Sequence, residues 1–154
     1  MFTHIFYFRI DLKKQHLDLD ISIPKLNIQG KYEVSGNVLV LAINGKGDAN
    51  LTIDSINLKI GLDWEDKQKK GNLHSHITGY KVDFTVARLY IYFDNLFNGD
   101  KLLGENMNTF LNENWEAVLT DFRPAIGQTV GETVKLILNN IFEIIPFDML
   151  FPEK

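Results

Sequence analysis

The sequence predicts an α+β protein in which a highly curved antiparallel β-sheet wraps around a long C-terminal helix. Three observations predict this fold. Apolar residues recur at a period near two up to about residue 94. Beyond that point the apolar period becomes that of a helix. The turns between the predicted strands are short, and short turns join antiparallel neighbours, so strands followed by helices give an α+β layer arrangement.

Composition narrows the class of protein. The chain has 154 residues, 45% of them hydrophobic and 23% charged, which suits one globular domain over residues 1–154. Its 16 basic and 20 acidic residues give a net charge of −4, whereas a nucleic-acid binder usually has a basic surplus. There is no Cys, so disulfides and thiolate metal sites are excluded. No apolar stretch is long enough to cross a bilayer.

The predicted strands alternate apolar and polar residues between turn residues. They cover residues 17–23, 31–43, 51–64 and 80–93. Pro24 marks an edge, a bulge or a strand end. The segments 45–48 and 65–72 are predicted to be hairpin turns. The alternation changes phase at residues 54–55 and again at 87–88, which predicts paired bulges where a long sheet curves.

Two apolar stripes at helical spacing follow the strands. Asn98-Gly99-Asp100 offers turn and cap residues before a first stripe over 103–122. Pro124 either kinks this helix or lies in the first turn of a second one. The second stripe covers 126–145 and ends at Pro146. Each predicted helical segment, about 21 to 23 residues at ~1.5 Å per residue, is about 31 to 35 Å long, which matches the longest strands.

The four histidines are the candidates for a general base or a metal ligand near neutral pH. His74 and His76 share a strand face and could hold a metal, but no third ligand lies at a telling offset, so we expect two solvated side chains. His4 and His16 stand alone. No nucleophile elbow, zinc-protease or kinase signature occurs. We therefore expect no enzymatic activity, no metal and no cofactor.

Three further features have a structural and a functional interpretation. Asp18 and Asp20 share a strand face, as acid–base pairs sometimes do, but their alternation with apolar residues predicts the solvent face. Gly127 and Gly131 leave a strip without side chains for close helix-on-sheet packing or for a ligand. The segment 50–52 (Asn-Leu-Thr) is a glycosylation acceptor if the protein is exported, and otherwise an unmodified strand segment.

Several segments resemble the takeout and haemolymph juvenile-hormone-binding protein family of insects. The C-terminal segments that carry the resemblance are 94–101 (DNLFNGDK), 103–108 (LGENMN), 110–115 (FLNENW), 124–126 (PAI), 140–142 (NIF) and 146–152 (PFDMLFP). Upstream, 30–36 (GKYEVSG) and 45–47 (GKG) fit the same family. The resemblance covers about residues 11–154, and residues 1–10 carry none of it.

The resemblance implies a tubular lipid-binding fold in a secreted haemolymph carrier of terpenoid hormones or other long apolar molecules, without catalysis or metal. Family members are longer and begin with a signal peptide, a Cys pair and an N-terminal helix. The resemblance therefore covers the C-terminal two thirds of the family's domain, and the opening residues are not expected to be a signal peptide. A receptor or binding protein for delivery is not identified.

The expected ligand is a juvenile-hormone-like terpenoid, a fatty acid or a similar lipid in an internal apolar tunnel. Its predicted walls are Leu58, Trp64, Phe84, Val86, Leu89, Ile91, Phe110, Leu111, Trp115, Ile126 and Val130. Tyr80, Tyr32 or the Trp115 indole nitrogen would address a polar end. The alternative is an interaction module with a filled core and no small ligand. A membrane-surface lipid binder is disfavoured by the negative charge, and a hydrolase by the lack of a nucleophile.

Overall fold

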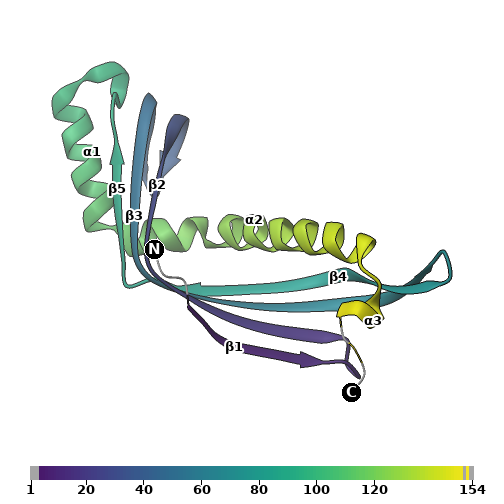
Figure 1. The fold of residues 1–154 in the computed structure, drawn as a ribbon. Helices are drawn as coiled ribbons and strands as arrows, with labels where there is room; N and C mark the ends of the chain where they lie inside the picture. The colour runs from purple at the N-terminus through teal and green to yellow at the C-terminus, as the bar shows by residue number, and fades with distance from the viewer. Residues whose placement is uncertain (1–3, 151, 153–154) are drawn as a thin grey trace. The chain divides into compact units, whose positions relative to one another are not determined.

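The structure is a computed structural model that describes residues 4–150 and 152, with side chains from residue 7 onward. The side chain of His4 and residues 1–3, 151, 153 and 154 lie outside the described part of the chain. The strands are β1 (His4–Asp11), β2 (His16–Val38), β3 (Leu41–Lys69), β4 (Asn72–Thr85) and β5 (Arg88–Phe93) (Figure 1). The helices are the 3-10 turn η1 (Phe97–Gly99), α1 (Lys101–Glu113), α2 (Trp115–Ile144) and α3 (Phe147–Leu150). The α+β class with a long C-terminal helix is confirmed.

The chain forms two compact units that share its longest elements. Unit 1 comprises Ser22–Asn57 and Thr85–Pro124, and unit 2 comprises His4–Ile21, Leu58–Phe84 and residues 125–150. The strand order is β1-β2-β3-β4, and β5 pairs with β3. Because β2, β3 and α2 each contribute to both units, the expectation of a single domain stays a prediction.

In unit 2 the sheet is built from β1, β4 and parts of β2 and β3, and the C-terminal part of α2 covers one face of it (Figure 1). In unit 1, β5 pairs antiparallel with β3 over Ala49–Asp54, and α1 lies beside β5. Asp100 caps α1, since its side chain accepts a hydrogen bond from the Leu103 amide at 3.0 Å. This cap is the one that the sequence predicted.

The two changes of phase are confirmed as irregularities in the strands. Ser55 has a positive φ of 54° inside β3, and β4 and β5 are separated at residues 86–87. The Ala87 amide donates to the Asp54 carbonyl at 2.9 Å, so the two irregularities face each other. The boundary between the units falls beside them in both strands.

The predicted hairpin turn at 45–48 is wrong, because these residues lie inside β3 and the turn is at Leu39-Val40. The glycines serve close backbone approach instead. A Cβ on Gly45 would lie 2.6 Å from the Tyr32 hydroxyl, and one on Gly47 would overlap the Asp94 carboxylate. Pro24 lies inside β2. The chain reverses within the predicted hairpin turn 65–72, but the turn itself is only residues 70–71, because β3 continues to Lys69.

The expectation of one continuous first helix over 103–122 is also wrong. Asn114 has non-helical dihedral angles (φ −111°, ψ 25°) and separates α1 from α2. Its side-chain amide donates to the Phe110 carbonyl at 2.8 Å, which satisfies the end of α1. Pro124 lies within α2 rather than at the start of a new helix, and α2 ends before Pro146 as predicted.

Candidate ligand-binding site

Unit 2 contains an apolar cluster between its sheet and α2. Its buried centre is Ile60, Leu62, Trp64 and Ile77. Partly buried apolar residues pack around that centre: Ile10, Leu17, Leu19, Leu58, Tyr80, Val82, Val130, Val134, Leu138 and Phe142. The last four recur every fourth residue, so they share one side of α2. This side of the helix is the one that holds the sheet.

A second side of α2 is also apolar but is exposed. Ile137 is 52% exposed, Ile141 39% and Ile144 81%, and their spacing of four and three residues aligns them along the helix. Leu136 beside them is 63% exposed. A helix whose apolar residues exceed one stripe normally buries more than one side. The C-terminal part of α2 therefore presents apolar surface that the described part of unit 2 leaves open.

Three hydrogen bonds hold α2 to strand β4 in unit 2. The Asn139 side chain accepts from the Ile77 amide at 2.7 Å and donates to the Ile77 carbonyl at 3.3 Å. His74 is buried, and its Nδ1 lies 2.8 Å from the Phe142 carbonyl, which can only accept, so Nδ1 carries the proton. The expectation of a solvated His74 is wrong, because this helix covers it.

Gly131 shows why the helix can lie so close to the sheet. A Cβ at this position would overlap the ring of Tyr80, whereas a Cβ on Gly127 would make an ordinary 3.9 Å contact with the Val82 carbonyl. Of the two interpretations of this glycine pair, close helix-on-sheet packing is the one that the structure shows. The Tyr80 hydroxyl donates to Glu132 at 2.9 Å, and that hydrogen bond, together with burial, raises the pKa of Tyr80.

Unit 2 also has an open, charged hollow of about 500 Å³. Its lining is Tyr7, His16, Asp18, Asp20, Lys59, Ile60, Gly61, Lys81 and Asp83. His16 lies 2.6 Å from Asp63 and 3.0 Å from Asp18, and hydrogen bonds to these two carboxylates raise the pKa of His16. Asp18 and Asp20 thus lie beside solvent, as predicted. So many charges make this hollow unsuited to an apolar molecule.

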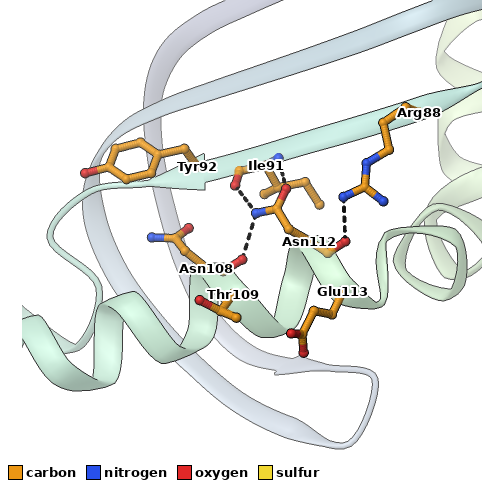
Figure 2. Close-up of a pocket in the computed structure, with 7 residues that line it drawn as sticks. All are labelled: Arg88, Ile91, Tyr92, Asn108, Thr109, Asn112 and Glu113. Carbon is orange, nitrogen blue, oxygen red and sulfur yellow. Dashed lines mark hydrogen bonds between the residues drawn. The ribbon is translucent and has the colours of Figure 1, made fainter.

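In unit 1, two asparagines of α1 bind the free edge of β5 (Figure 2). Asn112 accepts from the Ile91 amide at 2.9 Å and donates to the Ile91 carbonyl at 2.6 Å. Asn108 makes the same pair of hydrogen bonds with Phe93, at 2.9 and 2.8 Å. Four helical residues rise about 6 Å and two strand residues about 6.6 Å, so the two repeats match. The helix thus replaces a missing neighbouring strand.

An open hollow of about 570 Å³ lies beside this contact. Its lining is Arg88, Ile91, Tyr92, Asn108, Thr109, Asn112 and Glu113 (Figure 2). The Arg88 guanidinium donates to the Asn112 carbonyl at 3.0 Å, near the end of α1, and lies 5.0 and 5.4 Å from the ring centres of Tyr90 and Trp115. Arg88 thus stabilises the junction between the helices.

The eleven predicted wall residues divide between the two units. Unit 2 holds Leu58, Trp64, Phe84, Ile126 and Val130, and unit 1 holds Val86, Leu89, Ile91, Phe110, Leu111 and Trp115. Leu58, Trp64 and Val130 meet in the apolar cluster of unit 2, whereas Ile126 is 37% exposed. In unit 1, Val86 and Trp115 line an open hollow of about 340 Å³. Whether these residues contact a ligand stays a prediction.

The residues predicted to address a polar ligand end already have partners in the protein. The Tyr32 hydroxyl donates to the Asp94 carbonyl, and burial raises the pKa of Tyr32. Tyr80 binds Glu132, and the Trp115 ring lies under Arg88. The sequence analysis assigned no site role to Asn139 or Arg88. The only signal for the asparagines was the spacing of Asn108 and Asn112, one helical turn apart.

The described residues contain no group of three or more His, Asp or Glu that could hold a metal ion. Within the same part of the chain, no helix is long and apolar enough to cross a membrane.

Comparisons with known proteins place the fold among proteins of one family. The chain is 28% identical over 139 residues to circadian clock-controlled protein daywake of Drosophila melanogaster, an alignment that covers 90% of this chain and 54% of daywake. It is 30% identical over 146 residues to daywake of Drosophila yakuba, covering 94% and 56%. The chain thus spans about half the length of the curated relatives it matches.

The crystal structure of Epiphyas postvittana Takeout 1 superposes with a TM-score of 0.83 at 27% identity, over 94% of this chain and 67% of Takeout 1. A model of the haemolymph juvenile hormone binding protein family matches residues 3–152, which includes most of the N-terminal segment in which the sequence showed no resemblance. With almost the whole length matched, the chain belongs to the haemolymph juvenile hormone binding protein family.

Proposed function

We propose that this chain binds an elongated hydrophobic molecule along the exposed apolar side of α2 and carries it without chemical change. The observation that carries the proposal is the double apolar character of this helix in unit 2: Val130, Val134, Leu138 and Phe142 hold the sheet, and Ile137, Ile141 and Ile144 remain exposed. Membership of a family described as juvenile hormone binding proteins supports it.

The energetics favour a long ligand. Burial of ~300 to 400 Å² of apolar ligand surface at ~25 cal/mol/Å² gives roughly 7 to 10 kcal/mol, and association costs about 4 kcal/mol or more. Micromolar affinity needs about 8 kcal/mol net. Apolar contact therefore has to be supplemented by close packing and by one or two hydrogen bonds to a polar ligand end. A terpenoid ester or a fatty acid has both features.

Of the predicted wall residues, Ile126 and Val130 lie on α2, and Leu58 and Trp64 lie in the cluster that supports it. We propose Ile126, which is 37% exposed, as the wall residue of unit 2 that contacts the ligand, and Leu58, Trp64 and Val130 as residues that hold α2 against the sheet. We also propose an extracellular setting, because the matched family model is described as haemolymph proteins.

The proposal is tested by titrating the purified chain with a fluorescent long-chain fatty acid and displacing it with juvenile hormone. Ile137→Asp and Ile141→Asp place a charge on the exposed apolar side, where unfolding is not expected. Each should weaken binding by about tenfold or more, since a buried apolar side chain contributes ~1.5 to 3 kcal/mol. Val40→Asp is the matched control, because Val40 is 89% exposed at the β2–β3 turn.

The rival function is an interaction module with a filled interior. Organic extraction of the purified protein, followed by lipid analysis, separates the two. A co-purifying apolar molecule favours the carrier. Two results would contradict the proposal. One is a purified protein that neither carries nor takes up such a molecule, and the other is an equal affinity for the fatty acid in all three charged variants.

A further inference from the structure

Asn50, on β3 in unit 1, begins the only Asn-Xaa-Ser/Thr sequence in the chain, Asn50-Leu51-Thr52. The side chain of Asn50 is exposed, and the half-buried Leu51 next to it belongs to the opposite face of the strand. Across the ladder, Asn50 pairs with Tyr92 of β5, and Thr52 pairs with Tyr90. The acceptor sequence therefore lies on the open face of a regular sheet.

The hydrogen bonds around Asn50 leave its reactive atom available. The Asn27 side-chain amide, on β2, donates to Asn50 Oδ1 at 2.7 Å and to Thr52 Oγ1 at 2.8 Å. Asn50 Nδ2, the atom to which N-linked sugars attach, makes no hydrogen bond to the described residues. Because an N-linked amide keeps its oxygen as an acceptor, a sugar on Nδ2 is compatible with both contacts from Asn27.

The partner residue across the ladder offers a surface for a sugar. Tyr92 is 56% exposed, and side chains of directly opposed residues have Cβ atoms about 4.5 to 5.5 Å apart. A tyrosine ring is apolar on its face and polar at its hydroxyl, which suits a sugar ring with C–H groups on one side. Tyr92 also lines the open hollow of about 570 Å³ beside α1, so part of its side chain faces open space (Figure 2).

We propose that Asn50 is an N-glycosylation site of the exported protein and that its first sugar packs against Tyr92. In the transfer step, Asn50 Nδ2 forms a bond to the anomeric carbon of an oligosaccharide carried on a polyprenyl diphosphate. The bond from that carbon to the diphosphate oxygen breaks, the diphosphate leaves with the electron pair, and Nδ2 loses one proton. Transfer takes place on the unfolded chain, so the fold has only to leave Nδ2 pointing to solvent.

The site assignment is tested by secreting the chain from insect cells behind a cleavable signal. The tryptic peptide of residues 47–59 is then analysed by mass spectrometry after peptide-N-glycosidase treatment in ¹⁸O-water, which converts a glycosylated Asn into labelled Asp. Wild type, Thr52→Ser and Asn27→Ala should carry the label at Asn50, because all three keep the acceptor sequence. Asn50→Gln and Thr52→Ala should lack it. An unlabelled peptide from the secreted wild type overturns the assignment.

The packing against Tyr92 has its own test. Enzymatic removal of the glycan from folded wild type should lower the thermal midpoint, whereas removal from Tyr92→Thr should leave it unchanged. Thr is a good strand former, so this substitution keeps the ladder while it removes the ring. An equal loss of midpoint in both proteins contradicts the contact and leaves the site assignment to the peptide result. Neither experiment depends on ligand binding.

Discussion

The side chain of Asn112 on α1 binds both backbone groups of Ile91 on β5: it accepts a hydrogen bond from the amide at 2.9 Å and donates one to the carbonyl at 2.6 Å. Its second amide hydrogen reaches the Asn108 carbonyl at 2.7 Å. Asn139 on α2 makes the equivalent pair with Ile77 on β4 in the other unit. Each unit thus attaches a helix to a strand edge through an asparagine, and each edge is closed to further strand pairing.

We expect Asn112→Ala to destabilise the protein by about 1 to 3 kcal/mol, because it leaves a buried amide and carbonyl of β5 without partners. Urea unfolding monitored by circular dichroism measures the change. Asn106→Ala on the same helix is the control, since Asn106 is exposed, and it should be neutral or slightly stabilising. Equal effects of the two substitutions would refute the role of Asn112.

Gly131→Ala and Gly127→Ala should have effects of opposite sign. The Gly131 substitution forces the Tyr80 ring away from α2, which costs roughly 1 to 3 kcal/mol as overpacking. At Gly127 there is room for the methyl group, so the better helix propensity of Ala should gain up to about 1 kcal/mol. Thermal unfolding of both variants checks the signs. In a Tyr80→Ala background the Gly131→Ala substitution should no longer lower the stability, because the ring is absent. Loss of stability at both positions would contradict this account.

The His16 cluster predicts a pH dependence of stability. Asp63 and Asp18 raise the pKa of His16 in the folded state, and Arg9 also faces Asp18 at 3.4 Å. The stabilisation is present in full below the unfolded pKa of about 6.5 and is lost as the pH rises through the raised folded pKa. His16→Gln should remove this fall in unfolding free energy as the pH rises above about 6.5, and His76→Gln should keep it. An unchanged slope in His16→Gln would count against the cluster.

Much of the fold could be predicted from residues that are close together in the sequence. The phase changes at residues 54–55 and 87–88 and the Asp100 cap each depend on residues close in sequence, and each is confirmed. The bounds of the predicted strand 31–43 are wrong, because a turn at residues 39–40 divides it between β2 and β3. The errors arose where a distant residue decides. Gly45 and Gly47 resemble turn residues, but the neighbouring side chains of Tyr32 and Asp94 explain them.

The candidate site was less predictable for the same reason. Helical periodicity identifies the apolar residues of α2 but not which side the sheet covers. Val130 is packed against the sheet while Ile126, on the same stripe, is 37% exposed. The burial of His74 likewise depends on the Phe142 carbonyl, 68 residues away in the sequence.

The most direct test of the central claim is the equilibrium titration of the purified chain and its Ile137→Asp variant with the fluorescent fatty acid. The account predicts saturable binding by wild type and by Val40→Asp, and an affinity at least about tenfold lower for Ile137→Asp, since a factor of ten corresponds to 1.4 kcal/mol. Absence of binding by wild type, or equal affinity in all three proteins, would contradict the claim that the exposed apolar side of α2 holds the ligand.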